Sequence, residues 1–175
     1  MRIRAIVYTS NTGHTKKYAE MLGRLTGLPV YRLENAVREI AKGTRVIYLG
    51  WLFAGSLKGY RTAAKHFTLA AVCGVGLCDT GAMTDEVRRA ISLPEEIPLF
   101  TMQGGIDKTR LTGIHKFMIR MLIKGLSAKK SPTEEERRML ELLCRDADYV
   151  SKENAAAFCA WYEALGEKKK TEARV

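Results

Sequence analysis

This chain contains little of what builds a metal centre or a disulfide framework. It has four cysteines and three histidines in 175 residues, and no two cysteines stand in the CxxC spacing of zinc or redox sites. The histidines are also far apart in the sequence. We therefore expect no metal site, and we interpret the cysteines as buried, reduced thiols: Cys73, Cys78, Cys144 and Cys159.

Long apolar runs and a signal peptide are missing as well. No stretch holds 18 or more consecutive apolar residues, so no helix is expected to span a bilayer. The N-terminal stretch MRIRAIVY has a short apolar run and no cleavage region, which is not typical of a signal peptide. The expected location is the cytoplasm. A chain of 175 residues, 46% of them hydrophobic, fits one folded domain.

Acidic residues are fewer than basic residues in this chain. The 19 Asp and Glu residues stand against 29 Lys and Arg, a net charge of +10 at pH 7. Such a surplus favours an anionic partner: nucleic acid, anionic lipid or an acidic ligand. Nucleic acid is the weakest of these hypotheses because the chain has no RNP-like or zinc-finger signature. We expect no nucleic-acid partner.

Five β-type runs alternate with helix-type patterns through the first hundred residues. The expected strands are 3–8, 29–33, 45–53, 70–79 and 97–103, and the expected helices are 15–27, 35–43, 59–68 and 83–91. This alternation predicts an α/β fold, a doubly wound five-stranded parallel sheet with helices on both faces. Thr84 is the expected cap of the last helix because acids follow it in the first turn.

After residue 106 the pattern becomes purely helical. Helices are expected over 109–126, 131–150 and 152–165, and the charged tail 166–175 is expected to fray. Neither a repeat nor a linker marks a second domain. We therefore expect a single domain over 1–165, in which 106–165 forms a helical C-terminal extension.

The stretch YTSNTGHT, residues 8–15, places four hydroxyl side chains around one glycine directly after the first expected strand. In a doubly wound sheet, ligands bind at the carboxyl ends of the strands, where the strand order reverses. The stretch also precedes a helix, whose free N–H groups and dipole attract an anion. Gly13 would let the backbone approach closely or adopt a positive φ. A plain helix cap needs only one hydroxyl, so the stretch predicts a cradle for one phosphate.

Two common nucleotide motifs are absent. A P-loop needs GxxxxGK[ST] and the dinucleotide fingerprint needs GxGxxG, and the 8–15 stretch has neither. The GVG at 74–76 lies inside an expected strand, where close backbone packing explains it better. The expected ligand therefore carries a single phosphate and is not a dinucleotide.

The stretch YTSNTGHT resembles the phosphate loop of flavodoxins, which bind FMN at this place. The likeness covers strand, loop and helix, and the strand pattern extends it to about residue 105. It implies a flavodoxin-like sheet with strand order 2-1-3-4-5 and FMN as the cofactor. By this resemblance six residues would hold the phosphate: Ser10, Asn11, Thr12, Gly13, His14 and Thr15. At His14 we expect the backbone N–H to bind while the ring faces solvent.

The same resemblance places the flavin ring between the loops that follow the third and fourth strands. Trp51 and Phe53 offer flat apolar faces for stacking, and Gly55 offers backbone freedom. Trp51 could equally be a core residue that closes the third strand. The residues expected to contact the ring are Trp51, Leu52, Phe53, Ala54, Gly55, Asp79, Thr80 and Gly81.

A second segment, MQGGIDKTRLTGIHKFMIRML (102–122), resembles the matching part of bacterial menaquinone-dependent protoporphyrinogen oxidases and related flavodoxin-domain proteins. This likeness implies an FMN-dependent oxidoreductase that passes electrons from a reduced substrate, with protoporphyrinogen as the candidate, to a quinone-like acceptor. The alternative is a non-enzymatic flavodoxin-type electron carrier, although such carriers are typically acidic. Gly104 and Gly105 indicate either a pocket rim or a tight turn. We find no acid–base constellation and assign no catalytic residue.

The expected helix in this segment is both apolar and basic. Its apolar residues recur at spacings of three and four: Leu111, Ile114, Phe117, Met118, Met121, Leu122 and Leu126. Around them stand Lys108, Arg110, Lys116, Arg120, Lys124, Lys129 and Lys130. With Asp107 as the one acid, the 106–130 segment has a net charge of +6. The helix either packs on the sheet with a solvated basic face or offers a surface to anionic lipid or porphyrin propionates.

Overall fold

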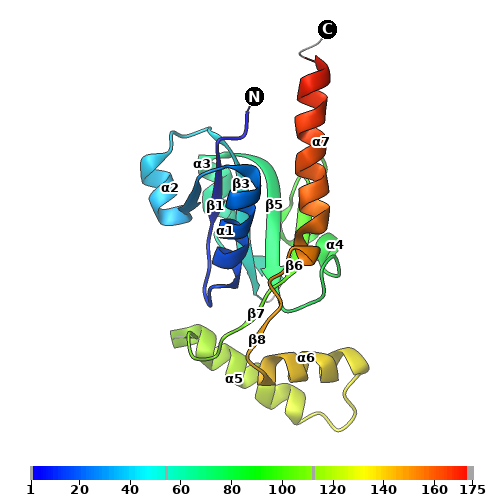
Figure 1. Ribbon diagram of the computed structural model, residues 1–175. Coiled ribbons are helices and arrows are strands. Elements are labelled where there is room, and N and C mark those ends of the chain that lie inside the picture. Colours follow the sequence, from blue (N-terminus) through cyan, green and yellow to red (C-terminus); the bar gives the residue numbers. More distant parts are fainter. Residues whose placement is uncertain (1, 54, 112, 173–175) are drawn as a thin grey trace.

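The computed structural model describes residues 2–53, 55–111 and 113–172, and it shows an α/β fold around one parallel sheet (Figure 1). The parallel strands are β1 (Ala5–Tyr8), β2 (Val30–Arg32), β3 (Arg45–Phe53), β5 (Thr68–Gly76) and β6 (Leu99–Gln103). They pair in the order β2-β1-β3-β5-β6. The predicted flavodoxin-like order is therefore confirmed. The sequence did not indicate β4 (Ser56–Leu57), which pairs antiparallel with the end of β3.

Four helices connect the strands at the predicted places. They are α1 (His14–Thr26), α2 (Leu33–Glu39), α3 (Tyr60–His66) and α4 (Thr84–Ile91). The prediction that Thr84 caps α4 is wrong: Met83 occupies the cap position and makes no side-chain cap hydrogen bond. The Thr84 hydroxyl donates to the Gly81 carbonyl oxygen and lies 2.9 Å from the Thr101 hydroxyl. The Thr84 side chain therefore contacts β6 and does not cap α4.

The sheet is buried on both faces, which explains its nearly continuous apolar strands. Successive residues of β3 point to opposite sides: Val46 and Tyr48 join one core cluster, and Ile47 and Leu49 the other. The first cluster lies under α2, α3 and α4, whereas α1 and the C-terminal helix cover the second. Each fully buried Ile or Val contributes about 1.5–3 kcal/mol. The carboxyl edge of the sheet thus rests on strands that are packed on both faces.

The helical extension begins beyond the carboxyl edge of the sheet, where α5 (Gly113–Ser127) and α6 (Glu134–Cys144) lie together (Figure 1). Two short strands, β7 (Gly105–Ile106) and β8 (Ala147–Asp148), pair antiparallel and link this helix pair to the sheet. The tight-turn interpretation of Gly104 and Gly105 is therefore wrong. A 3-10 turn, η1 (Glu153–Ala155), leads into α7 (Ala156–Glu172).

The predicted helix over 131–150 was too long. Helix α6 ends at Cys144, and the Asp146 carboxylate accepts the backbone N–H of Lys108 at 2.9 Å. Pairing of β8 with β7 outweighs the helical pattern of the sequence after Cys144, because it satisfies backbone groups that a free helix end would leave open. The helix predicted over 152–165 is present as α7, which continues to Glu172 through sequence expected to fray.

Two further expectations concern membranes and thiols. Within the described ranges, no helix is long and apolar enough to cross a bilayer. All four cysteines are free, but only Cys73 is fully buried and Cys144 is exposed. The expectation that every thiol is buried is therefore wrong. Cys144 is exposed because it ends α6, outside the sheet core.

Candidate functional site

The loop between β1 and α1 leaves the start of α1 without a side-chain cap. Gly13 has φ 104°, a left-handed conformation that favours glycine, and it immediately precedes α1. No side chain caps this helix, and the Ser10 Oγ accepts the Gly13 N–H at 3.2 Å instead. The first N–H groups of α1 therefore have no helical acceptor and remain available to an anion. The interpretation of the hydroxyls as an ordinary helix cap is therefore wrong, because no side chain caps α1.

A cation lies against this loop. A Cβ placed on Gly13 would stand 2.9 Å from Nη1 of Arg110, so the guanidinium packs on the loop backbone. The Arg110 Nε is 3.1 Å from the Asp107 carboxylate, which also accepts the Thr109 N–H. Sequence reasoning grouped Arg110 with a basic segment and missed this placement. Only the return of the chain from β6 toward β1 brings the two segments together.

The His14 ring is buried, contrary to the expectation that it faces solvent. The residue is 7% exposed, and its Nδ1 lies 3.1 Å from the Thr12 hydroxyl oxygen. Its Nε2 lies 3.8 Å from the carboxylate of Asp148 on β8, which also pairs with Lys17. Burial lowers the pKa of His14 below its usual value of 6.5, although the Asp148 charge opposes the shift. The imidazole is therefore largely neutral at pH 7. Its ring lies between the loop and β8.

Acidification should weaken the fold through His14. Because the folded-state pKa lies below the unfolded value, the unfolded chain takes up the proton first as pH falls below about 6.5. We expect the free energy of unfolding to drop more steeply between pH 7.5 and 5.5 in wild type than in His14→Gln. Because one proton is involved, the slopes of the free energy of unfolding against pH can differ by at most about 1.4 kcal/mol per pH unit between the two proteins. Urea unfolding at several pH values measures it, with His66→Gln in α3 as control; parallel curves for wild type and His14→Gln would contradict it.

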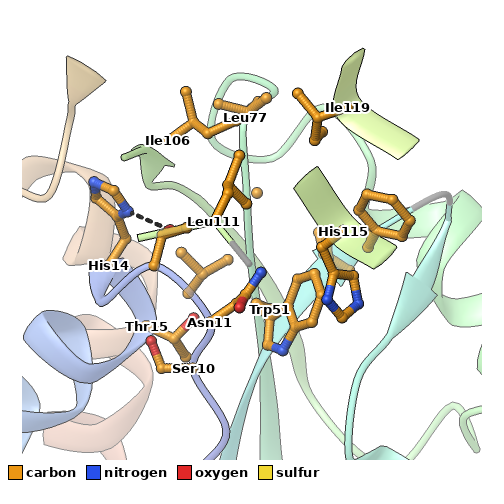
Figure 2. A pocket seen from close by; sticks show the side chains of 16 residues that line it. Ser10, Asn11, His14, Thr15, Trp51, Leu77, Ile106, Leu111, His115 and Ile119 are labelled. Atoms are coloured by element: carbon orange, nitrogen blue, oxygen red, sulfur yellow. Dashed lines mark hydrogen bonds between the residues drawn. The ribbon is translucent and has the colours of Figure 1, made fainter. Parts of the chain in front are cut away.

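The end of β3 presents an aromatic wall beside the loop (Figure 2). The Trp51 and Phe53 rings lie 5.8 Å apart, and the His115 ring of α5 packs edge-on against both, at 4.9 and 5.6 Å. The Lys58 ammonium lies 5.6 Å from the Phe53 ring centre. Trp51 is only half-buried and belongs to neither core cluster of the sheet. This placement favours a binding role for Trp51 over the core interpretation.

The structure brings most of the predicted site residues to one pocket. Those that line it are Ser10, Asn11, Thr12, His14, Thr15, Trp51, Leu52 and Phe53. Gly105 lines the same pocket, in agreement with the rim interpretation. Leu111, which precedes α5, and His115 and Ile119 of α5 also line it, and the sequence did not indicate that they belong to the site.

The second predicted ring loop is only partly in place. Asp79 and Gly55 line a larger, adjoining cavity. The Thr80 hydroxyl donates to the Asn154 side-chain oxygen at 2.8 Å, and the Gly81 N–H donates to the Thr101 carbonyl oxygen at 3.1 Å. Neither Thr80 nor Gly81 lines the pocket at the loop or the adjoining cavity. Ala54 lies outside the described residues.

Comparison with known families agrees with this arrangement. A family model described as a flavodoxin domain matches residues 5–133. The chain belongs to the flavodoxin domain family. Membership indicates a flavin-binding protein with a redox or electron-transfer role. Comparisons with curated proteins and with solved structures gave no match.

The matched flavodoxin domain includes the loop 10–15, the aromatic wall and α5. Its residues fit the FMN that such domains typically bind. Hydroxyl groups, open N–H groups and the Arg110 guanidinium meet at Gly13, which suits a phosphate. The half-buried Trp51 offers a flat apolar face of the kind that stacks on an aromatic ring.

Proposed function

We propose that this flavodoxin domain is an FMN-dependent oxidoreductase that takes electrons from a reduced substrate and passes them to a quinone-like acceptor. The observation that carries the proposal is the uncapped start of α1, lined by hydroxyls and faced by Arg110. FMN would supply the redox chemistry. The loop 10–15 would hold its phosphate, and Trp51 and Phe53 would orient its ring and exclude water. Protoporphyrinogen is a candidate reduced substrate because of the likeness of the 102–122 segment.

Cofactor uptake tests this proposal. The purified protein should bind about one FMN per chain, released on denaturation and distinguishable from FAD. Riboflavin should bind more weakly than FMN, because it lacks the phosphate that the loop and Arg110 would contact. Stoichiometric FAD, equal affinity for riboflavin, or no uptake from excess FMN would overturn the proposal.

A non-enzymatic electron carrier is the competing function, and the fold by itself fits it equally well. Steady-state turnover separates the two functions. We expect FMN-loaded protein to reduce a soluble quinone repeatedly with protoporphyrinogen as electron donor, whereas a carrier would need protein partners.

We also propose that the 108–130 segment contacts an anionic membrane surface. Five of the seven exposed large hydrophobic residues in the described structure lie on α5: Ile114, Phe117, Met118, Met121 and Leu122. Ile114 and Phe117 are 69% and 63% exposed, so the helix does not bury its apolar residues on the sheet. The packed-helix interpretation therefore holds only for the inner face, at Ile119, Ile123 and Leu126.

The basic residues of α5 stand beside this exposed stripe. Lys116, Arg120 and Lys124 are all exposed and follow one another at a spacing of four, which places them in one row along the helix. An apolar stripe flanked by a basic row is the arrangement of helices that lie in a membrane interface. A quinone acceptor dissolves in the bilayer, so this contact would bring the site to its acceptor.

A further inference from the structure

A further pocket lies on the α2 side of the loop between β1 and α1, and we name it the α2-side pocket. Its volume of about 600 Å³ lies within the range of small-molecule pockets, roughly 300–1,000 Å³. Residues at the carboxyl ends of three neighbouring strands line it: Thr9 follows β1, Arg32 ends β2 and Trp51 lies near the end of β3. Ligands of doubly wound sheets bind along this edge.

The α2-side pocket is separate from the site proposed for FMN. The cavity under α5 and α6 is lined by both predicted ring loops, so it belongs to that site, and none of its described lining residues lines the α2-side pocket. Of the described residues, Ser10, Asn11 and Trp51 line both the α2-side pocket and the pocket at the loop, whereas His14 and Thr15 line the latter alone. A bound FMN would therefore leave the α2-side pocket open.

Backbone contacts fix one wall of the α2-side pocket at Lys58. The Lys58 carbonyl oxygen accepts the Tyr48 hydroxyl at 2.5 Å and the Thr9 hydroxyl at 2.8 Å. Gly59 has φ 80°, and a Cβ there would stand 2.5 Å from Cγ2 of Thr9, so this close passage of the chain requires glycine. Because these contacts involve backbone atoms, the wall does not depend on the Lys58 ammonium.

The charges of the α2-side pocket favour an anion. Three cations and one carboxylate line it: Arg32, Arg38, Lys58 and Glu34. Arg32 pairs with Glu34 at 2.9 Å, whereas none of the ion pairs in the described part of the chain includes Arg38 or Lys58. The Lys58 ammonium lies 6.0 Å from the Trp51 ring centre instead. Two cations are therefore available to the charge of a ligand.

The α2-side pocket also has an apolar wall. Leu33 is buried, and Val37 and Trp51 are half-buried, and all three line the pocket. An indole face of this kind stacks on a flat ring, and Arg and Lys side chains bind carboxylates. The combination of this wall with Arg38 and Lys58 suits a ligand that is both aromatic and anionic.

We propose that the α2-side pocket binds a flat aromatic ring that carries carboxylates. The inference goes beyond the proposed function and does not depend on it, because the pocket lies outside the cradle at Gly13 and the cavity under α5 and α6. With FMN bound, Trp51 would lie between the two ligands, since it lines both the α2-side pocket and the pocket at the loop.

Equilibrium dialysis of the full-length protein, with and without FMN, tests the proposal. The probe is naphthalene-2,6-dicarboxylate, and its neutral partner of the same shape is naphthalene-2,6-dicarboxamide. We expect FMN-loaded wild type to bind the dicarboxylate at least about tenfold more tightly than the diamide, and added salt to reduce the difference. This comparison needs no variant and so does not depend on a variant that folds.

Removing the two cations should remove the preference for the dicarboxylate. Arg38→Gln with Lys58→Gln should weaken its binding about tenfold, while the affinities for FMN and for the diamide stay unchanged. The matched control is Arg24→Gln with Lys42→Gln, which removes the same charges at exposed positions outside the pocket lining. Arg24 lies in the last turn of α1, as Arg38 lies in the last turn of α2. The control should behave as wild type.

Four results would overturn the inference: no binding of the dicarboxylate, equal affinity for the two probes, wild-type binding by the folded Arg38 and Lys58 double variant, or loss of dicarboxylate binding when FMN is added. The last result would make the pocket part of the flavin site. Protein that takes up no FMN would overturn the proposed function instead. The same dialysis, with Arg110→Gln added to remove the cation at the loop, would then decide the present inference.

Discussion

Replacing Thr12 and Thr15 together with valine is expected to weaken FMN binding more than a hundredfold. Each hydroxyl hydrogen bond to a charged phosphate contributes about 1.5–3 kcal/mol, and each 1.4 kcal/mol is about a tenfold change in Kd. Valine has nearly the shape of threonine, so the buried position of Thr15 stays filled. Titration of apo-protein with FMN, followed by flavin fluorescence, measures the loss.

The matched control for this double variant is Thr26→Val in the last turn of α1. Its hydroxyl donates to the Leu22 carbonyl oxygen at 2.7 Å, far along the helix from the loop. FMN affinity should be unchanged in Thr26→Val. Because the Thr12 hydroxyl also lies 3.1 Å from His14 Nδ1, urea unfolding of the double variant must confirm that the apo fold is kept. Unchanged FMN affinity in the double variant would show that the phosphate lies elsewhere.

Anionic vesicles are expected to sediment the protein at low salt and to release it at high salt. Basic residues near an anionic surface contribute about 1 kcal/mol each, and salt screens them. The triple variant Lys116→Gln, Arg120→Gln and Lys124→Gln should therefore bind about a hundredfold more weakly, without loss of FMN. Co-sedimentation with vesicles at two salt concentrations measures both effects.

The apolar stripe should contribute in a way that salt does not screen. Phe117→Gln with Met121→Gln should weaken vesicle binding at both salt concentrations. Leu25→Gln, at another exposed hydrophobic residue but on α1, is the matched control. If wild type stays in the supernatant with anionic vesicles at low salt, α5 is not a membrane surface. The soluble electron-carrier function would then be favoured.

Local patterns were enough to predict the alternation of strands and helices, and the resemblance of residues 8–15 to flavodoxins supplied the strand order that the sheet has. The apolar run of β3 was predicted with both its ends correct, because a strand buried on both faces is continuously apolar. The phosphate cradle was predicted from local sequence too, because its hydroxyls, Gly13 and the start of α1 are neighbours in the chain. The family comparison over residues 5–133 confirms the flavodoxin-like fold.

The remaining features of the site depend on contacts between distant segments. Pairing of β8 with β7 ends α6 early and places Asp148 beside the buried His14 ring. The chain leaving β6 brings Arg110 onto Gly13, and α5 and α6 enclose a cavity that no single segment reveals. Periodicity describes which face of an element is apolar, but it contains no information about which distant element covers that face. For that reason the sequence could predict an amphipathic α5, and only the tertiary structure decided that one side roofs the cavity while the other remains exposed.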